Sequence, residues 1–149
     1  MRKLGLIGGM SWAATELYYR FINQEIQRRA GPSCSAPLLI ESLNFCDMAR
    51  MTTPEQWDHA VEVLAASAKR LEGGGATAIL ICANSMYKVV DQVQAAVSIP
   101  IIHIVDPVGK AMKADGIKTG VARHAQCDAG KLVSAAPCQP RRQPRASRE

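Results

Sequence analysis

The sequence lacks any long hydrophobic run. A helix that crosses a membrane needs roughly 20 consecutive apolar residues, and no segment reaches that length. The apolar run Leu4 to Ile7 follows the basic residues Arg2 and Lys3, but Gly8 and Gly9 end it at once. Because this run is too short for the core of a signal peptide, we predict a buried first strand, no membrane partner and a cytoplasmic location.

Paired metal-binding and redox motifs are also absent. The sequence contains no C-x-x-C pair, which argues against a zinc ribbon and against a redox motif. The G-x-G-x-x-G pattern of dinucleotide-binding proteins is missing as well. We therefore predict no metal site and no dinucleotide cofactor. In a cytosolic protein the cysteines are expected to be free thiols, most of them structural: Cys34, Cys46, Cys82, Cys127 and Cys138.

Most of the chain lacks an excess of charge of either sign. Residues 1–119 carry 12 Lys and Arg against 11 Asp and Glu, whereas residues 120–149 carry 6 against 2. The net charge of +5 is therefore concentrated in the C-terminal segment. A nucleic-acid-binding face on a folded domain would need clustered basic residues, so we predict no nucleic-acid partner.

Four short apolar runs are typical of strands. They are Leu4 to Ile7, Leu38 to Ile40, Ile79 to Cys82 and Ile101 to Ile104. The third run shows no alternation, which is the pattern of a strand buried on both faces. An amphipathic stretch follows each run. Four strand–helix pairs in sequence predict an α/β domain with one parallel sheet and helices on both faces.

Capping signals predict where these helices begin and end. The first helix is predicted to run from a cap at Ser11 to Gly31. The second is predicted to run from Thr53 to Gly73, and the Gln56 side chain can bond back to the Thr53 cap. The third is predicted from Val89 up to Pro100, and the fourth from Asp106 to near Gly116. The apolar face of the first helix is expected to comprise Leu17, Tyr18, Phe21, Ile22 and Ile26.

The character of the sequence changes at Gly120. Residues 137–149 contain three prolines and four arginines and cannot pack a core or hold a regular element. We predict an α/β domain over residues 1–119 and a basic, disordered tail over residues 120–149. A frameshift or truncation after about residue 119 is the sharper alternative, because the break falls where a fifth strand is due.

Polar residues follow the apolar runs at one edge of the predicted sheet. Parallel strands bring their C-terminal ends to the same edge, where ligands bind. The segment Cys82-Ala83-Asn84-Ser85 combines a thiol, an amide and a hydroxyl at the predicted start of a helix. It is suited to hold a carboxylate and to offer a thiol, because a helix N-terminus lowers thiol pKa. Alternatively, Cys82 packs within the strand and Ser85 caps the helix.

The other segments at this edge are less specific. The turn at Gly8 and Gly9 permits close approach of a ligand, and the amides that start the first helix can bind an anion. An ordinary tight turn explains the glycines equally well. Asp106 before Pro107 is predicted to cap the fourth helix, and His103 between isoleucines to be a satisfied core histidine.

Four motifs occur together in order. They are G-L-I-G-G-M-S-W at 5–12, Tyr18-Tyr19-Arg20, C-A-N-S-M-Y-K at 82–88 and I-P-I-I-H-I-V-D at 99–106. With these motifs the chain resembles the N-terminal domain of the aspartate/glutamate racemase family, including its broad-specificity amino-acid racemase branch. The resemblance implies an isomerase of amino-acid metabolism that needs no cofactor. It also implies two similar α/β domains around one site, each giving one residue, usually a cysteine, that removes or returns the α-proton.

The resemblance also implies roles for particular residues. Cys82 is the candidate catalytic thiol. The candidate residues for binding the amino-acid substrate are Met10, Ala83, Asn84 and Ser85.

Three departures from the family pattern bear on activity. Ala83 stands where two-cysteine members carry cysteine, and Tyr87 stands where they carry histidine. The second domain, with its catalytic cysteine, is missing from the sequence. We therefore predict a racemase-type domain that is inactive by itself. The alternative is a non-catalytic half-domain that binds a ligand or forms a homo-oligomer, or the product of a decayed gene.

Overall fold

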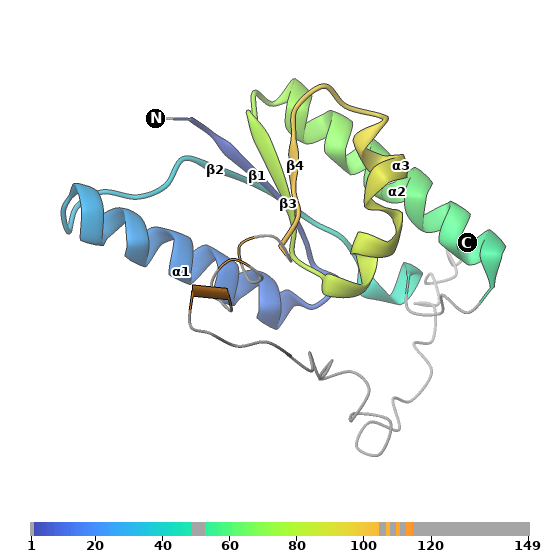
Figure 1. Cartoon of the computed structure of the whole chain (residues 1–149), viewed down its shortest axis with the longest axis horizontal. Helices are drawn as coiled ribbons and strands as arrows, with labels where there is room; N and C mark the ends of the chain where they lie inside the picture. Colours follow the sequence, from blue (N-terminus) through green and yellow to red (C-terminus); the bar gives the residue numbers. More distant parts are fainter. Residues whose placement is uncertain (1, 49–52, 105–106, 108–109, 111–112, 115–149) are drawn as a thin grey trace, which may run out of the picture. The chain divides into compact units, whose positions relative to one another are not determined.

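Four parallel strands form the centre of the described structure. The computed structural model describes residues 2–48, 53–104, 107, 110, 113 and 114. The strands lie in the spatial order β2-β1-β3-β4, and all three pairings are parallel (Figure 1). The predicted parallel α/β sheet is therefore confirmed. The strand bounds are β1 (Leu4–Gly8), β2 (Leu38–Ser42), β3 (Ala78–Ile81) and β4 (Ile101–Ile102).

Helix α1 (Trp12–Ala30) begins and ends where the capping signals predict. The Ala14 amide donates to the Ser11 hydroxyl at 3.3 Å, so Ser11 is the N-cap. Gly31 follows the last turn with a φ of 116°, which residues with a Cβ rarely adopt. Both boundaries of the first helix are therefore confirmed.

Helix α2 (Pro54–Gly73) also matches its predicted bounds. The Thr53 amide donates to Gln56 Oε1 at 3.1 Å, as expected for a capping box. Leu64 and Ala68 on its apolar side are fully buried. Full burial of a leucine side chain stabilises a fold by about 1.5–3 kcal/mol, so this side fixes α2 on the sheet.

The glycines of β1 show which helix covers which face of the sheet. A Cβ added to Gly5 would lie 3.2 Å from the Cβ of Leu71 in α2, whereas one added to Gly8 would clash with Thr15 in α1. Helix α1 therefore covers one face, and α2 and α3 (Val90–Gln94) the other, as Figure 1 shows. Helices on both faces are confirmed.

The two faces are covered to different extents. On the α2 face of β3, Ile79 and Ile81 are fully buried, while Leu80 on the other face is only partly buried. Cys82, which follows Leu80 on that face, is 2% exposed, so the predicted burial of this strand on both faces is confirmed only in part. The reason is that α1 covers its face thinly, with Thr15 as its one buried residue.

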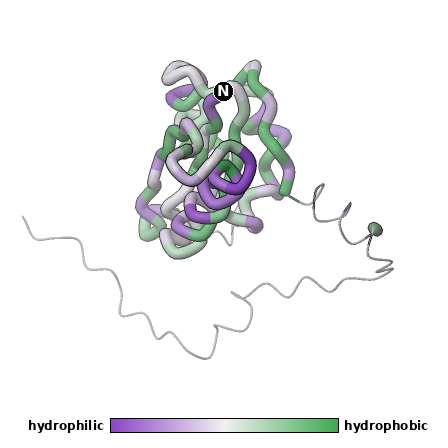
Figure 2. Tube along the Cα trace, turned by 90° about the vertical axis from the view of Figure 1, so that its left-hand side faces the viewer, coloured by the Kyte–Doolittle hydropathy of each residue, from purple (hydrophilic) through white to green (hydrophobic). Residues whose placement is uncertain are grey.

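Apolar side chains remain exposed on and around α1. Phe21 is 60% exposed, so the predicted apolar face of this helix is only partly correct: Tyr18, Ile22 and Ile26 are partly buried. Figure 2 shows hydrophobic and hydrophilic segments interleaved along the trace. We call the large exposed apolar residues of α1 and of its sheet face the α1 patch: Trp12, Leu17, Tyr19, Phe21, Ile40 and Ile102.

The third helix is shorter than predicted. A 3-10 helix, η2 (Asn84–Val89), precedes α3, which ends at Gln94. The Gln94 side chain donates to the carbonyls of Val97 and Ile99 and accepts from the amide of Ile101 at 2.7 Å. Because these side-chain bonds hold the residues that lead into β4, the helix does not continue towards Pro100.

The structure leaves the C-terminal predictions untested. Residues 1–111 form one compact unit, and within the predicted fourth helix Pro107, Lys110, Lys113 and Ala114 are helical. The remaining residues of that segment and residues 115–149 lie outside the described ones. The boundary at Gly120 and the disordered tail therefore stay predictions.

Candidate functional site

The C-terminal ends of all four strands lie at one edge of the sheet. The β1–α1 turn lies closely against the residues that follow β2, because the Leu43 amide donates to the Gly8 carbonyl at 2.9 Å. Gly9 has a φ of 83°, and a Cβ there would clash with the Leu43 backbone. Only glycine fits both the conformation and this close approach. The close approach predicted at these glycines is therefore to another turn of the same chain.

Two amides near the start of α1 have partners within the chain. The Gly9 amide donates to the Thr15 hydroxyl at 3.0 Å, and the Ala14 amide donates to Ser11. The Thr15 hydroxyl donates in turn to the Ser11 carbonyl at 3.0 Å. These two amides therefore stabilise the start of the helix, and the structure favours an ordinary tight turn over the predicted anion site.

Met10 is part of the apolar core. Its side chain is 2% exposed and belongs to the same buried cluster as Ile7, Ile81 and Met86. The substrate-binding role that resemblance implies for Met10 stays a prediction. The structure gives its side chain a packing role.

Cys82 is buried and follows the last residue of β3. Its amide donates to the Ile7 carbonyl at 2.8 Å, which continues the strand ladder, and its side chain is 2% exposed. Burial raises the pKa of the thiol to about 12. The expected lowering of this pKa is wrong, because desolvation dominates. These features support packing within the strand.

The next three residues are less buried than Cys82. Ala83 is partly buried against the core, Asn84 is exposed and Ser85 is partly buried. Ala83 is the N-cap of η2 and makes no side-chain cap bond, so the alternative that Ser85 caps the helix is wrong. The amide of Asn84 and the hydroxyl of Ser85 thus lie at the sheet edge where ligands of parallel α/β proteins bind.

A group of aromatic and thiol side chains lies beside this segment. Tyr87 is buried, its hydroxyl donates to the Ile102 carbonyl at 2.9 Å, and its ring centroid lies 4.4 Å from that of His103. Burial raises the pKa of Tyr87 to about 12, and burial together with Cys82 raises the pKa of Tyr18. These groups are therefore uncharged at neutral pH.

Sequence reasoning missed this group. His103 is partly buried and packs against the Tyr87 ring, which agrees in part with the predicted core histidine. The sequence feature that could have revealed this group is Tyr87, a tyrosine at a position where the family resemblance implies histidine.

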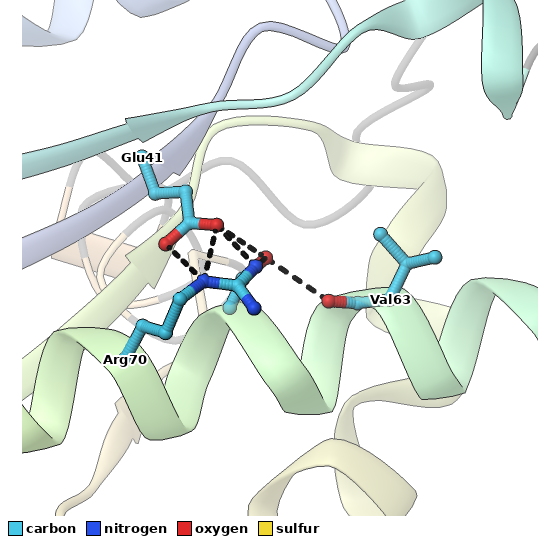
Figure 3. Close-up of polar contacts among 4 residues, drawn as sticks. Glu41, Val63 and Arg70 are labelled. Carbon is cyan, nitrogen blue, oxygen red and sulfur yellow. Dashed lines mark hydrogen bonds and ion pairs between the residues drawn. The ribbon is translucent and has the colours of Figure 1, made fainter.

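Glu41, at the predicted edge after the second apolar run, is engaged with α2. Its carboxylate accepts from Arg70 Nε at 2.8 Å and lies 3.2 Å from the Ser67 hydroxyl (Figure 3). That hydroxyl is also 3.0 Å from the Val63 carbonyl. The ion pair connects β2 to α2. The Glu41 carboxylate therefore stabilises the fold rather than binding a ligand directly.

The described residues form neither a metal-binding cluster nor a membrane-spanning helix. In this part of the chain, His, Cys, Asp and Glu side chains form no group of three or more that could hold a metal ion. Among the helices that the structure describes, none combines the length and hydropathy needed to cross a bilayer.

A comparison with protein families decides the identity of the domain. The model of the Asp/Glu/Hydantoin racemase family matches residues 7–122. The chain belongs to this racemase family. The match ends close to Gly120, where the sequence changes character.

Two solved structures are similar to this racemase-family domain. A candidate Asp/Glu racemase from Yersinia pestis is 38% identical, with a TM-score of 0.73. An aspartate racemase homologue from Pyrococcus horikoshii OT3 is 35% identical, with a TM-score of 0.68. Each match covers 78% of this chain and 50% of the other. The racemase-family chain thus spans about half the length of these relatives.

Proposed function

We propose that this chain binds an acidic amino acid at the C-terminal edge of its sheet, a function inherited from cofactor-independent aspartate/glutamate racemases. The observation that carries the proposal is the family match over residues 7–122, together with the position of Asn84 and Ser85 directly beyond β3. An amide and a hydroxyl can bond both the carboxylates and the ammonium group of such a ligand. We also propose a cytoplasmic location, because the described cysteines are thiols rather than disulfides.

Racemisation needs more than these residues supply. One group must remove the α-proton from one face of the amino acid, and another must return a proton to the opposite face. Ala83 has no proton to give. Cys82 is the adjacent thiol, but with a pKa raised to about 12 it holds very little thiolate at neutral pH. We infer that these residues bind the amino acid without racemising it.

Separate assays of binding and turnover test this proposal. Circular dichroism at fixed wavelength should show no racemisation of L- or D-aspartate or glutamate above buffer. Calorimetric titration should show binding of at least one of them, and Asn84→Ala should weaken that binding about tenfold, because a hydrogen bond to a charged group is lost. Gln24→Ala, an exposed change on α1, is the matched control. Turnover that scales with protein concentration and survives repurification would contradict the inactive state.

Self-association is a second candidate function. The observation that favours it is the set of large exposed apolar residues that make up the α1 patch, since exposed apolar surface often marks an interface. In this alternative the chain is an oligomerising half-domain. Binding without association supports the first proposal, and association without binding supports the second.

A further inference from the structure

Tyr87 connects the two segments that leave β3 and β4. It belongs to η2, and only 8% of its surface is exposed. Its hydroxyl bonds to the Ile102 carbonyl in β4, while its ring packs on the imidazole of His103 at a tilt of 46°. One side chain therefore sets the spacing between the Asn84–Val89 segment and the residue after β4.

The position of His103 relates this contact to the candidate site. In the pairing of β3 with β4, Leu80 lies opposite Ile102. If this register is extended by one residue, His103 lies opposite Ile81. Ile81 is the last residue of β3, three residues before Asn84. His103 is partly buried, and an imidazole is suited to bond a carboxylate oxygen.

We propose that Tyr87 is a positioning residue that presents the His103 imidazole to a carboxylate of the bound acidic amino acid. The inference rests on the proposed function and adds His103 as a ligand-contacting residue beside Asn84 and Ser85. The Tyr87 ring orients the imidazole, and its hydroxyl fixes η2 to β4. The two parts of the site thereby keep one spacing.

The environment of the phenol agrees with this role. Burial is the main cause that raises the pKa of Tyr87, and backbone hydrogen bonds with Ile81 and Ile104 act against it. The hydroxyl thus lies among the ends of β3 and β4 and remains a hydrogen-bond donor at neutral pH.

The test uses the full chain and the proton–carbon NMR signals of its three histidine imidazoles, with L-aspartate as the probe. His103→Gln assigns the His103 signal, and His59 on α2, 3.9 Å from Glu62, is the internal reference. Tyr87→Phe removes only the hydroxyl, and Tyr87→Leu removes the ring as well. Tyr19→Phe, which removes an exposed hydroxyl on α1, is the matched control.

In the wild type and in Tyr19→Phe, L-aspartate should shift the His103 signal and leave His59 unchanged. Tyr87→Phe should move the His103 signal before ligand is added and raise the Kd read from it about fivefold, the range for loss of one hydrogen bond. Tyr87→Leu should raise the Kd further. Thermal melting of each variant separates these effects from a general loss of stability.

Three results would overturn the inference in distinguishable ways. If Tyr87→Phe lowers Tm but leaves the His103 signal and the Kd unchanged, Tyr87 stabilises the fold and does not position His103. If L-aspartate moves the amide signals of Asn84 and Ser85 but not the His103 imidazole, the contact is wrong while the proposed function stands. If neither L-aspartate nor D-aspartate nor either enantiomer of glutamate moves any of these signals, the proposed function itself fails.

Discussion

At the scale of single residues, the direction of the Cys82 side chain determines the chemistry of its thiol. Side chains alternate along a strand, so Cys82 lies on the same face as Leu80, the face that α1 covers. That placement buries the thiol and raises its pKa to about 12. The polar residues that follow the strand then remain as the part of the candidate site that we propose to bind the ligand.

We predict that Cys82 reacts slowly with a thiol reagent in the native protein. At pH 8 only about one thiol in ten thousand would be ionised, because the pKa lies about four pH units higher. The rate should rise tenfold per pH unit while the fold persists. Cys46, which is exposed, serves as the reactive control, and denaturant should remove the difference. Rapid native labelling that L-aspartate slows would instead restore Cys82 as the catalytic thiol.

The same thiol makes stability depend on pH in the alkaline range. The unfolded chain releases the Cys82 proton near the ordinary thiol pKa of about 8.5, whereas the folded chain keeps it until about pH 12. The free energy of unfolding should therefore be fully retained below about pH 8.5 and fall as pH rises above it. Denaturant melts of the wild type and of Cys82→Ala, in which this decline should be smaller, measure the effect.

At the scale of elements, side chains rather than helix ends hold the connection into β4. Gln94 bonds the residues before the strand, and Glu72 at the end of α2 accepts from the Ser98 amide at 2.9 Å and the Ile99 amide at 3.3 Å. The Ser98 hydroxyl and these amides lower the pKa of Glu72. This loop therefore depends on the charge of one carboxylate.

We predict that Glu72→Gln destabilises the chain at neutral pH and that the difference disappears in acid. A carboxyl whose pKa is lowered on folding stabilises the native state above its unfolded pKa of about 4.3, and this contribution is lost as pH falls through the folded value. Thermal melts of both proteins between pH 7 and pH 3 measure it. Glu62→Gln, another exposed glutamate of α2, is the control. A gap in Tm that stays constant with pH would contradict the prediction.

At the scale of the whole molecule, the α1 patch and the composition of the C-terminal segment lead to predictions about the behaviour of the chain in solution. Helix α1 leaves Phe21 and Leu17 exposed on the thinly covered side of the sheet. The composition of residues 120–149, with few large apolar residues and several prolines, predicts that they do not fold. Association through the patch and cleavage within the tail are the expected consequences.

We predict that trypsin cleaves residues 120–149 before the rest of the chain and that the product still self-associates. Light scattering should report particles larger than a monomer. Phe21→Arg should shift the population towards monomer, because a charge would be buried in the contact, while Gln24→Arg on the same helix should not. A protease-resistant, strictly monomeric full-length chain would show that the tail folds and that the boundary at Gly120 is wrong.

The sequence by itself determined the features that depend on neighbouring residues. Ser11, Gly31 and Thr53 bound two helices through local caps, and the four apolar runs identify the strands of a parallel sheet. The four motifs that together carry the family resemblance can be read from the sequence because the residues of each motif are adjacent in the chain.

Only the tertiary structure decided features that depend on distant residues. Cys82 is buried, and its pKa raised, by its packing environment in the folded chain. Tyr87 meets Ile102 and His103 across 15 or more positions of sequence, and Gln94 ends α3 early by bonding the backbone before β4. No local pattern encodes these contacts, because they arise when separate strands come to lie side by side and side chains from different elements compete for the same space.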